Sequence, residues 1–241
     1  MDSFQRRLTF TGPFWILASL LVSPSCSLEV VSGIQVSKAP LRRGAADGPY
    51  CFVAQNPTQL RRHDNFLATQ VWPSARLAAT CVEAHLNKEW TVCELGCGPG
   101  LPALTAAHCG SSKVYATDID SLALKMLQAA AKEQKLDVET SIVDLTSDEP
   151  LPDADLYILS DVFETGRVAE GAARVVEDIL SSQARVWVFA QTDRAQREVF
   201  LETLKKRCNN PSLAWCSPGS LDFANEVILL VDVDENNVLY G

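Results

Sequence analysis

The sequence carries too little positive charge for a protein that holds nucleic acid. Its 241 residues include 21 Lys and Arg against 30 Asp and Glu, a formal net charge of -9. Residues 1–48 contain slightly more basic than acidic residues, so the acidic excess lies in the rest of the chain. Grip on a phosphate backbone needs Lys and Arg gathered on one face. We therefore expect no nucleic-acid partner, and a basic or neutral partner is electrostatically favoured.

The sequence also lacks the cysteine spacing of a metal site. It has eight cysteines but no Cys-x-x-Cys pair, and Cys93 and Cys97 have no histidine near them. A chain of this size can bury a core without disulfide staples. We expect free thiols, most of them buried, and no bound metal.

No apolar stretch approaches the ~20 residues that a membrane-spanning helix needs. The apolar run 13–22 follows Arg6 and Arg7 and precedes small polar residues, which is the layout of a signal peptide. We interpret residues 1–28 as a targeting segment, with a buried N-terminal helix as the alternative, and expect no stable membrane anchor after processing. Residues 29–56 contain few acids and resemble a transit segment or linker. The expected destination is an organelle (mitochondrion or plastid) or the secretory pathway.

From residue 57 to residue 241 the pattern alternates between strands and helices, which predicts a single domain. Apolar runs predict strands at 90–95, 113–117, 138–143, 155–160, 185–190 and 226–233, with a further short strand possible at 214–217. Between them, helical spacing predicts helices that start at Ser74 and Ser121 and helices over 101–109, 167–180 and 194–208. Parallel neighbours need crossover helices, so this alternation indicates a Rossmann-like, doubly wound α/β fold with helices on both faces. Ligands of such sheets bind beyond the carboxyl ends of the strands.

A glycine-rich turn follows the first predicted strand of this domain. Gly96, Gly98 and Gly100 alternate with other residues, so the backbone can turn sharply and approach a ligand closely. The spacing is GxGxG and differs from the GxGxxG of dinucleotide-binding turns. Glu94 would repel a pyrophosphate but attract a ligand that carries an ammonium group and a sulfonium. The negative charge of Glu94 therefore favours S-adenosylmethionine as the ligand. Cys97 lies inside the turn that would hold it.

Acidic residues follow the next two predicted strands. Asp118 ends the second strand and precedes Ile119, and a carboxylate at this place can accept hydrogen bonds from ribose hydroxyls. Asp144 and Leu145 follow the third strand and can offer a polar contact and an apolar face to an adenine ring. These residues and the glycine turn together predict a nucleoside site.

Three stretches of the sequence resemble a known enzyme class. They are Gln70 to Ala75, Glu94 to Pro102 and Ser160 to Phe163, and the resemblance covers about residues 60–205. The chain resembles the class I, seven-β-strand S-adenosylmethionine-dependent methyltransferases, and more narrowly the methyltransferase-like group of protein lysine methyltransferases.

This resemblance implies a seven-stranded sheet, mostly parallel with one antiparallel strand, and a protein lysine side chain as the methyl acceptor. It makes Asp161 the catalytic residue, placed beside the methyl group. Together with the residues above, it gives a predicted cofactor-binding set of Trp72, Glu94, Gly96, Cys97, Gly98, Gly100, Asp118, Ile119, Asp144, Leu145 and Ser160. In one respect the chain departs from the subgroup, which places an aromatic residue where this chain has Glu164.

Three alternatives stay open at this point. The departure at Glu164 keeps a small-molecule methyltransferase on the same fold possible. A nicotinamide-dependent oxidoreductase is the alternative with a different cofactor, and a cofactor-binding scaffold without catalysis is a third. We expect a monomer that acts on a protein substrate.

Overall fold

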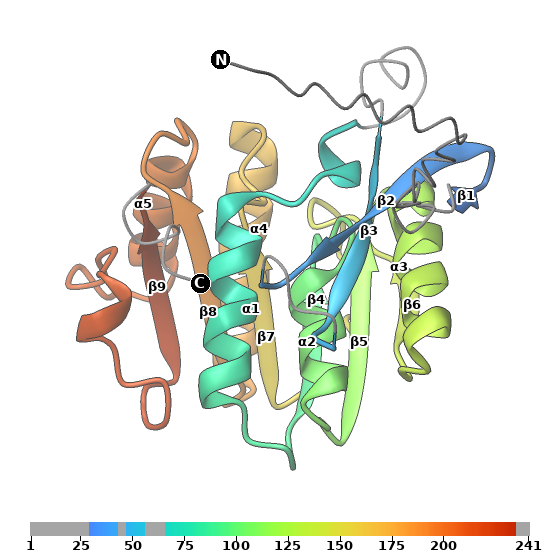
Figure 1. Ribbon diagram of the computed structural model, residues 1–241. Coiled ribbons are helices and arrows are strands. Elements are labelled where there is room, and N and C mark those ends of the chain that lie inside the picture. The colour runs from blue at the N-terminus through green and yellow to red at the C-terminus, as the bar shows by residue number, and fades with distance from the viewer. Residues whose placement is uncertain (1–28, 43–46, 56–65, 235–241) are drawn as a thin grey trace, which may run out of the picture.

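The computed structural model describes residues 29–42, 47–55 and 66–234, which form an α/β domain with an additional small sheet (Figure 1). The main sheet consists of β4 (Thr91–Leu95), β5 (Lys113–Asp118), β6 (Glu139–Ile142), β7 (Leu156–Ser160), β8 (Arg185–Gln191) and β9 (Ile228–Val233). The helices are α1 (Pro73–His85), α2 (Leu101–His108), α3 (Ser121–Gln134), α4 (Gly166–Ser181) and α5 (Arg197–Arg207), with 3-10 turns η2 (Phe66–Thr69) and η3 (Pro218–Ser220). The small sheet contains β1 (Glu29–Val31), β2 (Ile34–Pro40) and β3 (Tyr50–Ala54).

The order of the main sheet, β6-β5-β4-β7-β8-β9, determines where a ligand can bind. All neighbouring pairs in it are parallel. Helices α1, α2 and α3 pack on one face, and α4 and α5 pack on the other (Figure 1). After β4 the chain adds β5 and then β6 on one side of β4. It then returns to add β7 on the other side of β4. This reversal opens a crevice at the carboxyl ends of β4 and β7.

The doubly wound α/β fold predicted from the sequence is confirmed, with two differences in detail. The described main sheet has six strands, and its single seventh-strand contact is a parallel bridge from Cys216 to Val231 at the edge of β9. The antiparallel pairing that was expected in the main sheet occurs instead in the sheet β1 to β3. In the run 214–217, this bridge takes the place of the short strand that the sequence suggested.

Two predicted helix caps are displaced by one or two residues. Asp120, not Ser121, caps α3, and its Oδ1 accepts hydrogen bonds from the backbone N–H groups of Leu122 and Ala123. Ser74 lies inside the first turn of α1, because Pro73 begins that helix. The Ser74 hydroxyl is thereby free of a capping role and reaches another element, as described below.

Residues 29–56, interpreted from the sequence as a possible transit segment or linker, contain a sheet where the structure describes them. The three strands form a meander whose Val36, Cys51 and Phe52 are buried in the same core as α1, α2 and α3. Gln134 of α3 ties the sheet down, since its amide donates to the Tyr50 carbonyl at 2.8 Å and accepts from the Tyr50 N–H at 3.1 Å. A half-buried antiparallel sheet can be as poor in acids as a transit segment, so a low acid content does not distinguish the two.

The targeting segment predicted for residues 1–28, including the apolar run 13–22, lies outside the described residues. Within the described ranges, none of the helices has both the length and the apolar character required to cross a membrane.

We expect the small sheet to be an integral part of the domain's stability. Phe52→Ala should lower the free energy of unfolding by ~3–5 kcal/mol, the usual cost of truncating a buried Phe, because Phe52 is only 2% exposed. Val30→Ala, at a position 61% exposed in β1, is the matched control and should change stability by less than ~0.5 kcal/mol. Urea denaturation measures both. Equal midpoints for Phe52→Ala and wild type would show that the sheet is dispensable.

Candidate functional site

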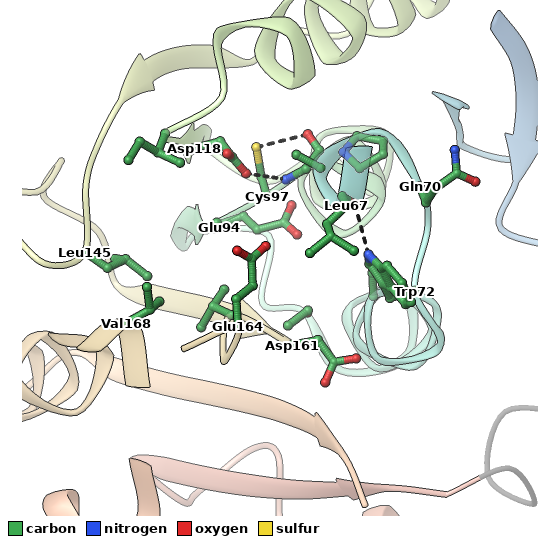
Figure 2. Close-up of a pocket in the computed structure, with 18 of the residues that line it drawn as sticks. Leu67, Gln70, Trp72, Glu94, Cys97, Asp118, Leu145, Asp161, Glu164 and Val168 are labelled. Atoms are coloured by element: carbon green, nitrogen blue, oxygen red, sulfur yellow. Dashed lines mark hydrogen bonds between the residues drawn. The ribbon is translucent and has the colours of Figure 1, made fainter. Parts of the chain in front are cut away.

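A cavity of about 140 Å³ opens at the carboxyl ends of β4, β5 and β7, where the sheet reverses direction (Figure 2). The structure brings almost the whole predicted site together around it. The predicted residues that line it are Trp72, Glu94, Gly96, Cys97, Gly98, Asp118, Ile119, Asp144, Leu145, Ser160 and Asp161.

The glycine turn forms the floor of the cavity in a conformation that favours glycine. Gly96 and Gly98 have φ values of 65° and 50°, which side-chain-bearing residues rarely adopt. The turn is fixed to the neighbouring strand by two bonds, from the Cys97 N–H to the Thr117 carbonyl at 2.9 Å and from the Gly98 N–H to Asp118 Oδ2 at 2.7 Å. A Cβ on Gly98 would come within 3.3 Å of the Ala68 carbonyl, so the turn also closes on η2.

Gly100 is the one member of the predicted set that does not line the cavity. It precedes α2 with φ 74°, and a Cβ there would lie 2.0 Å from Leu127 Cδ1 in α3. The third glycine therefore allows α2 and α3 to pack closely. The sequence pattern could not separate this packing role from ligand contact, because both require the absence of a side chain.

Glu94 is an acid almost completely enclosed beneath the glycine turn, with 1% of its surface exposed. Its Oε2 accepts a hydrogen bond of 2.9 Å from the Ala103 N–H in the first turn of α2, where the helix dipole favours negative charge. Burial nevertheless raises the pKa of Glu94 to about 8, against the opposing effect of the Ala103 bond. An added positive charge in the cavity would relieve this unfavourable burial.

Asp118 is also buried, but its carboxylate is partly bound by backbone groups. Besides the bond from Gly98 to Oδ2, its Oδ1 accepts from the Asp120 N–H at 2.8 Å. Burial raises the pKa of Asp118, while these two bonds oppose the rise. A carboxylate has about four acceptor positions, so lone pairs stay available to hydroxyl donors in the cavity.

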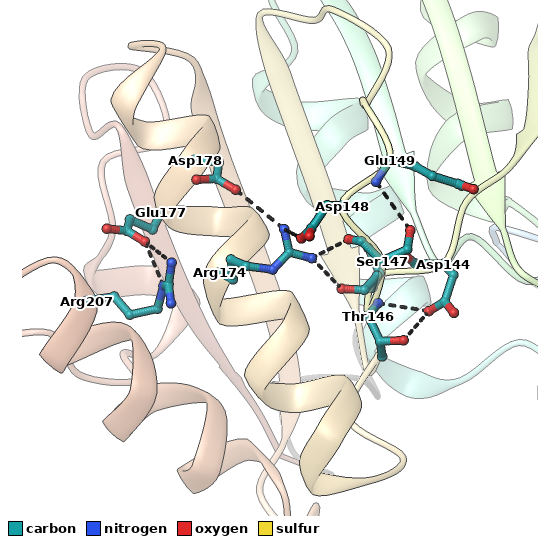
Figure 3. Close-up of polar contacts among 10 residues, drawn as sticks. Asp144, Thr146, Ser147, Asp148, Glu149, Arg174, Glu177, Asp178 and Arg207 are labelled. Atoms are coloured by element: carbon teal, nitrogen blue, oxygen red, sulfur yellow. Dashed lines mark hydrogen bonds and ion pairs between the residues drawn. The ribbon is translucent and has the colours of Figure 1, made fainter.

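The turn after β6 supplies the far wall, and α4 holds it in place (Figure 3). Asp144 Oδ1 accepts from the Thr146 N–H and hydroxyl, both at 2.8 Å, and the N–H bond lowers the pKa of Asp144. Arg174 of α4 donates to the Leu145 carbonyl at 3.3 Å and also to the Ser147 carbonyl. Leu145 is thus presented to the cavity on a turn with little freedom to move.

Asp161, the predicted catalytic residue, lines the cavity but has its carboxylate already engaged. It accepts from the Ser74 hydroxyl at 2.8 Å and the Gln191 N–H at 3.0 Å, and Arg194 Nε lies 3.5 Å away. Its φ of 55° is unusual for a residue other than glycine and marks a constrained turn after β7. Burial raises its pKa, and the Gln191 and Ser74 bonds counteract this. Such a residue is suited to positioning its neighbours rather than to removing a proton from a substrate amine.

Ser160 is the clearest sign that the cavity is built for a ligand. Its buried Oγ has no hydrogen-bond partner among the described residues, and the residue lines the cavity. A buried hydroxyl without a partner is uncommon and costs stability. A polar ligand in the cavity would satisfy it.

Several lining residues were not in the predicted set. Glu164 points toward Glu94 across the cavity (Figure 2). The turn η2 adds Leu67, whose carbonyl accepts from the Trp72 indole N–H at 3.0 Å. No periodic pattern marks a 3-10 turn, so sequence reasoning had no signal for Leu67, whereas the unusual acid at Glu164 was visible as a departure from the subgroup.

The charged side chains that line the cavity are all acidic. Five carboxyl groups line the cavity, from Glu94, Asp118, Asp144, Asp161 and Glu164. In the described part of the chain, no Lys, Arg or His lines it. The cavity is therefore complementary to a ligand that carries positive charge.

Comparison with known proteins agrees with this geometry. Residues 92–182 match the family model described as a methyltransferase domain. The chain is 30% identical over 80 residues to the ribosomal protein L11 methyltransferase of Thermotoga maritima, which covers 33% of this chain and 30% of that protein. A ribosomal protein L11 methyltransferase of Thermotoga neapolitana is 23% identical over 154 residues, 58% of each chain. The chain thus spans less than two thirds of the length of these relatives.

Among solved structures, a T. thermophilus 16S rRNA methyltransferase in complex with AdoMet and guanosine is similar in fold, with a TM-score of 0.50 and 19% identity over 70% of this chain and 45% of that chain. Residues 92–182 are thus similar to a methyltransferase domain, and the solved structure has the same kind of α/β fold.

The buried acid Glu94 should make stability depend on pH. Its pKa rises from an ordinary value of 4.5 to about 8 on folding, so the folded state prefers the protonated form. The stabilisation is complete below the ordinary pKa and is lost as pH rises toward 8, with a slope of at most ~1.4 kcal/mol per pH unit. Glu94→Gln keeps an acceptor for the Ala103 N–H and should flatten this part of the profile.

Urea denaturation of both proteins at pH values from about 5 to about 9 checks the sign. The variant should gain stability relative to wild type as pH rises. A stability difference independent of pH would show that Glu94 does not titrate in this range.

Proposed function

We propose that this protein transfers a methyl group from S-adenosylmethionine to a protein lysine side chain. The observation that carries the proposal is the cavity at the carboxyl ends of β4 and β7, lined by five carboxyl groups and by no basic side chain of the described residues. The cofactor carries a sulfonium and an ammonium, both positive. A nicotinamide dinucleotide carries an anionic pyrophosphate, so the same lining disfavours the oxidoreductase alternative.

The residues present fit this cofactor part by part. Glu94 and the glycine turn would hold its amino acid end, and Asp118 would accept bonds from the ribose hydroxyls. Leu145 offers an apolar surface to the adenine, and its neighbour Asp144 a polar edge. Ser160 and Trp72 lie on the side where β7 ends, next to the place for the reacting methyl group. When bound, the cofactor supplies an electrophilic methyl carbon.

The residues of this chain contribute alignment and protection from water. Methyl transfer is an in-line displacement, so holding both reactants in the correct geometry supplies much of the rate. The acceptor nitrogen must first lose a proton, because an ammonium has no lone pair. Removal from water favours the neutral amine, and Glu164 at the cavity wall is placed to receive the proton. The neutral nitrogen would then be held in line with the methyl group that the cofactor supplies when bound.

A protein acceptor is supported by relatives whose names specify one, ribosomal protein L11. The net charge of -9 supports a basic protein and disfavours RNA. The small-molecule alternative rests on Glu164, which replaces the subgroup's aromatic residue. Mass spectrometry of cell protein and metabolite fractions, each incubated with the purified protein and deuterated methyl donor, separates the two. Label on lysine supports our proposal, and label confined to metabolites contradicts it.

Asp118→Asn tests the cofactor assignment. Loss of the charge should weaken binding of S-adenosylhomocysteine by about ten-fold or more, because hydrogen bonds to a charged acceptor are stronger than those to an amide. Isothermal titration calorimetry measures the change. Asp153→Asn, outside the cavity, is the control and should bind as wild type does. Unchanged affinity in Asp118→Asn would contradict the ribose assignment.

Asp161→Asn tests whether Asp161 acts by positioning. We expect affinity for S-adenosylhomocysteine to stay within about two-fold of wild type while turnover falls by about 100-fold, since small misplacements are costly in alignment catalysis. Asp161→Glu, which keeps the charge but moves it, should recover little. Calorimetry and a labelled-donor assay measure the two properties, and the melting temperature controls for unfolding. Loss of cofactor affinity instead would make Asp161 a cofactor anchor.

A further inference from the structure

A second cavity, of about 280 Å³, lies directly beside the first. The two share a wall made by Leu67, Trp72, Asp161 and Glu164. Figure 2 shows Trp72, Asp161 and Glu164 at this boundary. The second cavity is also lined by the segment that joins β8 to α5, which includes Arg194. We call the first cavity the donor cavity, because it would hold the methyl donor. A molecule in the second cavity would face the donor cavity across the shared wall.

Arg194 occupies the second cavity with a positive charge. Its guanidinium carbon lies 4.7 Å from the centre of the Trp72 ring, a cation-π distance. Its Nε lies 3.5 Å from Asp161 Oδ1. An aromatic face beside a carboxylate is the combination that binds organic cations, so the structure already displays a cation in this cavity.

The contacts of Arg194 are incomplete, which makes the side chain displaceable. Its Nε is buried and has no hydrogen-bond partner among the described residues, although a buried donor is normally bonded. Asp161 accepts its hydrogen bonds from the Ser74 hydroxyl and the Gln191 N–H. Arg194 belongs to a connecting segment, and its side chain is 29% exposed, so a rotation carries the guanidinium into solvent.

We propose that Arg194 is an internal stand-in for the methyl acceptor, and that the alkylammonium end of the acceptor displaces it from the place between Trp72 and Asp161. This inference rests on the proposed function, which requires an amine next to the donor cavity. The three acids of the second cavity, Asp161, Glu164 and Asp193, outnumber its single base. The place stays suited to a cation after Arg194 leaves.

The stand-in would confer selectivity. A free amine must compete with a tethered guanidinium, whose local concentration is high. An acceptor that makes further contacts on the protein surface has additional binding energy with which to displace Arg194. The arrangement therefore favours a lysine within a protein over small amines.

The test uses n-butylammonium chloride, a minimal lysine side chain, titrated into the full domain by ligand-observed NMR. Arg194→Ala should bind n-butylammonium about ten-fold more tightly than wild type, since the competing cation is gone. Arg194→Lys keeps a tethered cation but loses the planar guanidinium over Trp72, so its affinity should lie between those of wild type and Arg194→Ala. Arg207→Ala is the matched control, because Arg207 pairs with Glu177 outside the cavity and should not change the affinity.

The double variant Arg194→Ala and Trp72→Leu should lose the gained affinity, which places the binding on the Trp72 face. Equal affinity of wild type and a folded Arg194→Ala overturns the proposal, and so does an equal gain in Arg207→Ala. Arg194→Ser serves as a second variant should Arg194→Ala be unstable. Melting of the same samples with S-adenosylhomocysteine separates the proposals: no shift in any protein contradicts the methyltransferase function, whereas the n-butylammonium result alone decides the role of Arg194.

Discussion

The hydrogen bond from the Gly98 N–H to the Asp118 carboxylate, 2.7 Å long, is the contact on which the geometry of the cavity depends. It joins the turn after β4 to the end of β5, the two strands on one side of the point where the sheet reverses. Because the N–H belongs to a glycine with positive φ, the bond forms only if the turn is wound as observed. Asp118 thus helps to shape the turn, and the turn in turn holds the carboxylate at the strand end, where a ligand can reach it.

Burying several acids close together is unfavourable for the protein alone, and the raised pKa values of three of them reflect this cost. Burial raises the pKa of Glu94, Asp118 and Asp161 despite the hydrogen bonds that each accepts. Buried Ser160 adds a hydroxyl without a partner in the described chain. Proteins tolerate such unfavourable groups mainly at functional sites. A cationic, polar ligand would relieve all of these costs at once, so the features that lower the stability of the protein are those that would strengthen binding.

The features best predicted from the sequence are those that depend on residues close together along the chain. The glycine turn, the acids at strand ends and the strand-helix alternation are local patterns, and the structure placed them together as the topology of parallel sheets requires. Features that depend on distant contacts escaped prediction. Gly100 leaves space for Leu127 of another helix, and the strands β1 and β3 contact α3. Asp161 accepts hydrogen bonds from Ser74 and Gln191, which are 87 and 30 positions away in the sequence. These hydrogen bonds could therefore not be predicted from the Ser-Asp-Val-Phe stretch alone.

Asp161 links the donor cavity, the second cavity and the framework between them. Its contacts reach Ser74 in α1, Gln191 at the end of β8 and Arg194 in the segment before α5. Displacement of Arg194 would remove one positive neighbour from Asp161 and leave its two hydrogen bonds in place. The carboxylate would then be held in the same position but with charge available to an incoming cation. Asp161 therefore lies on a constrained turn from which its carboxylate contacts both the framework and the cation of the second cavity.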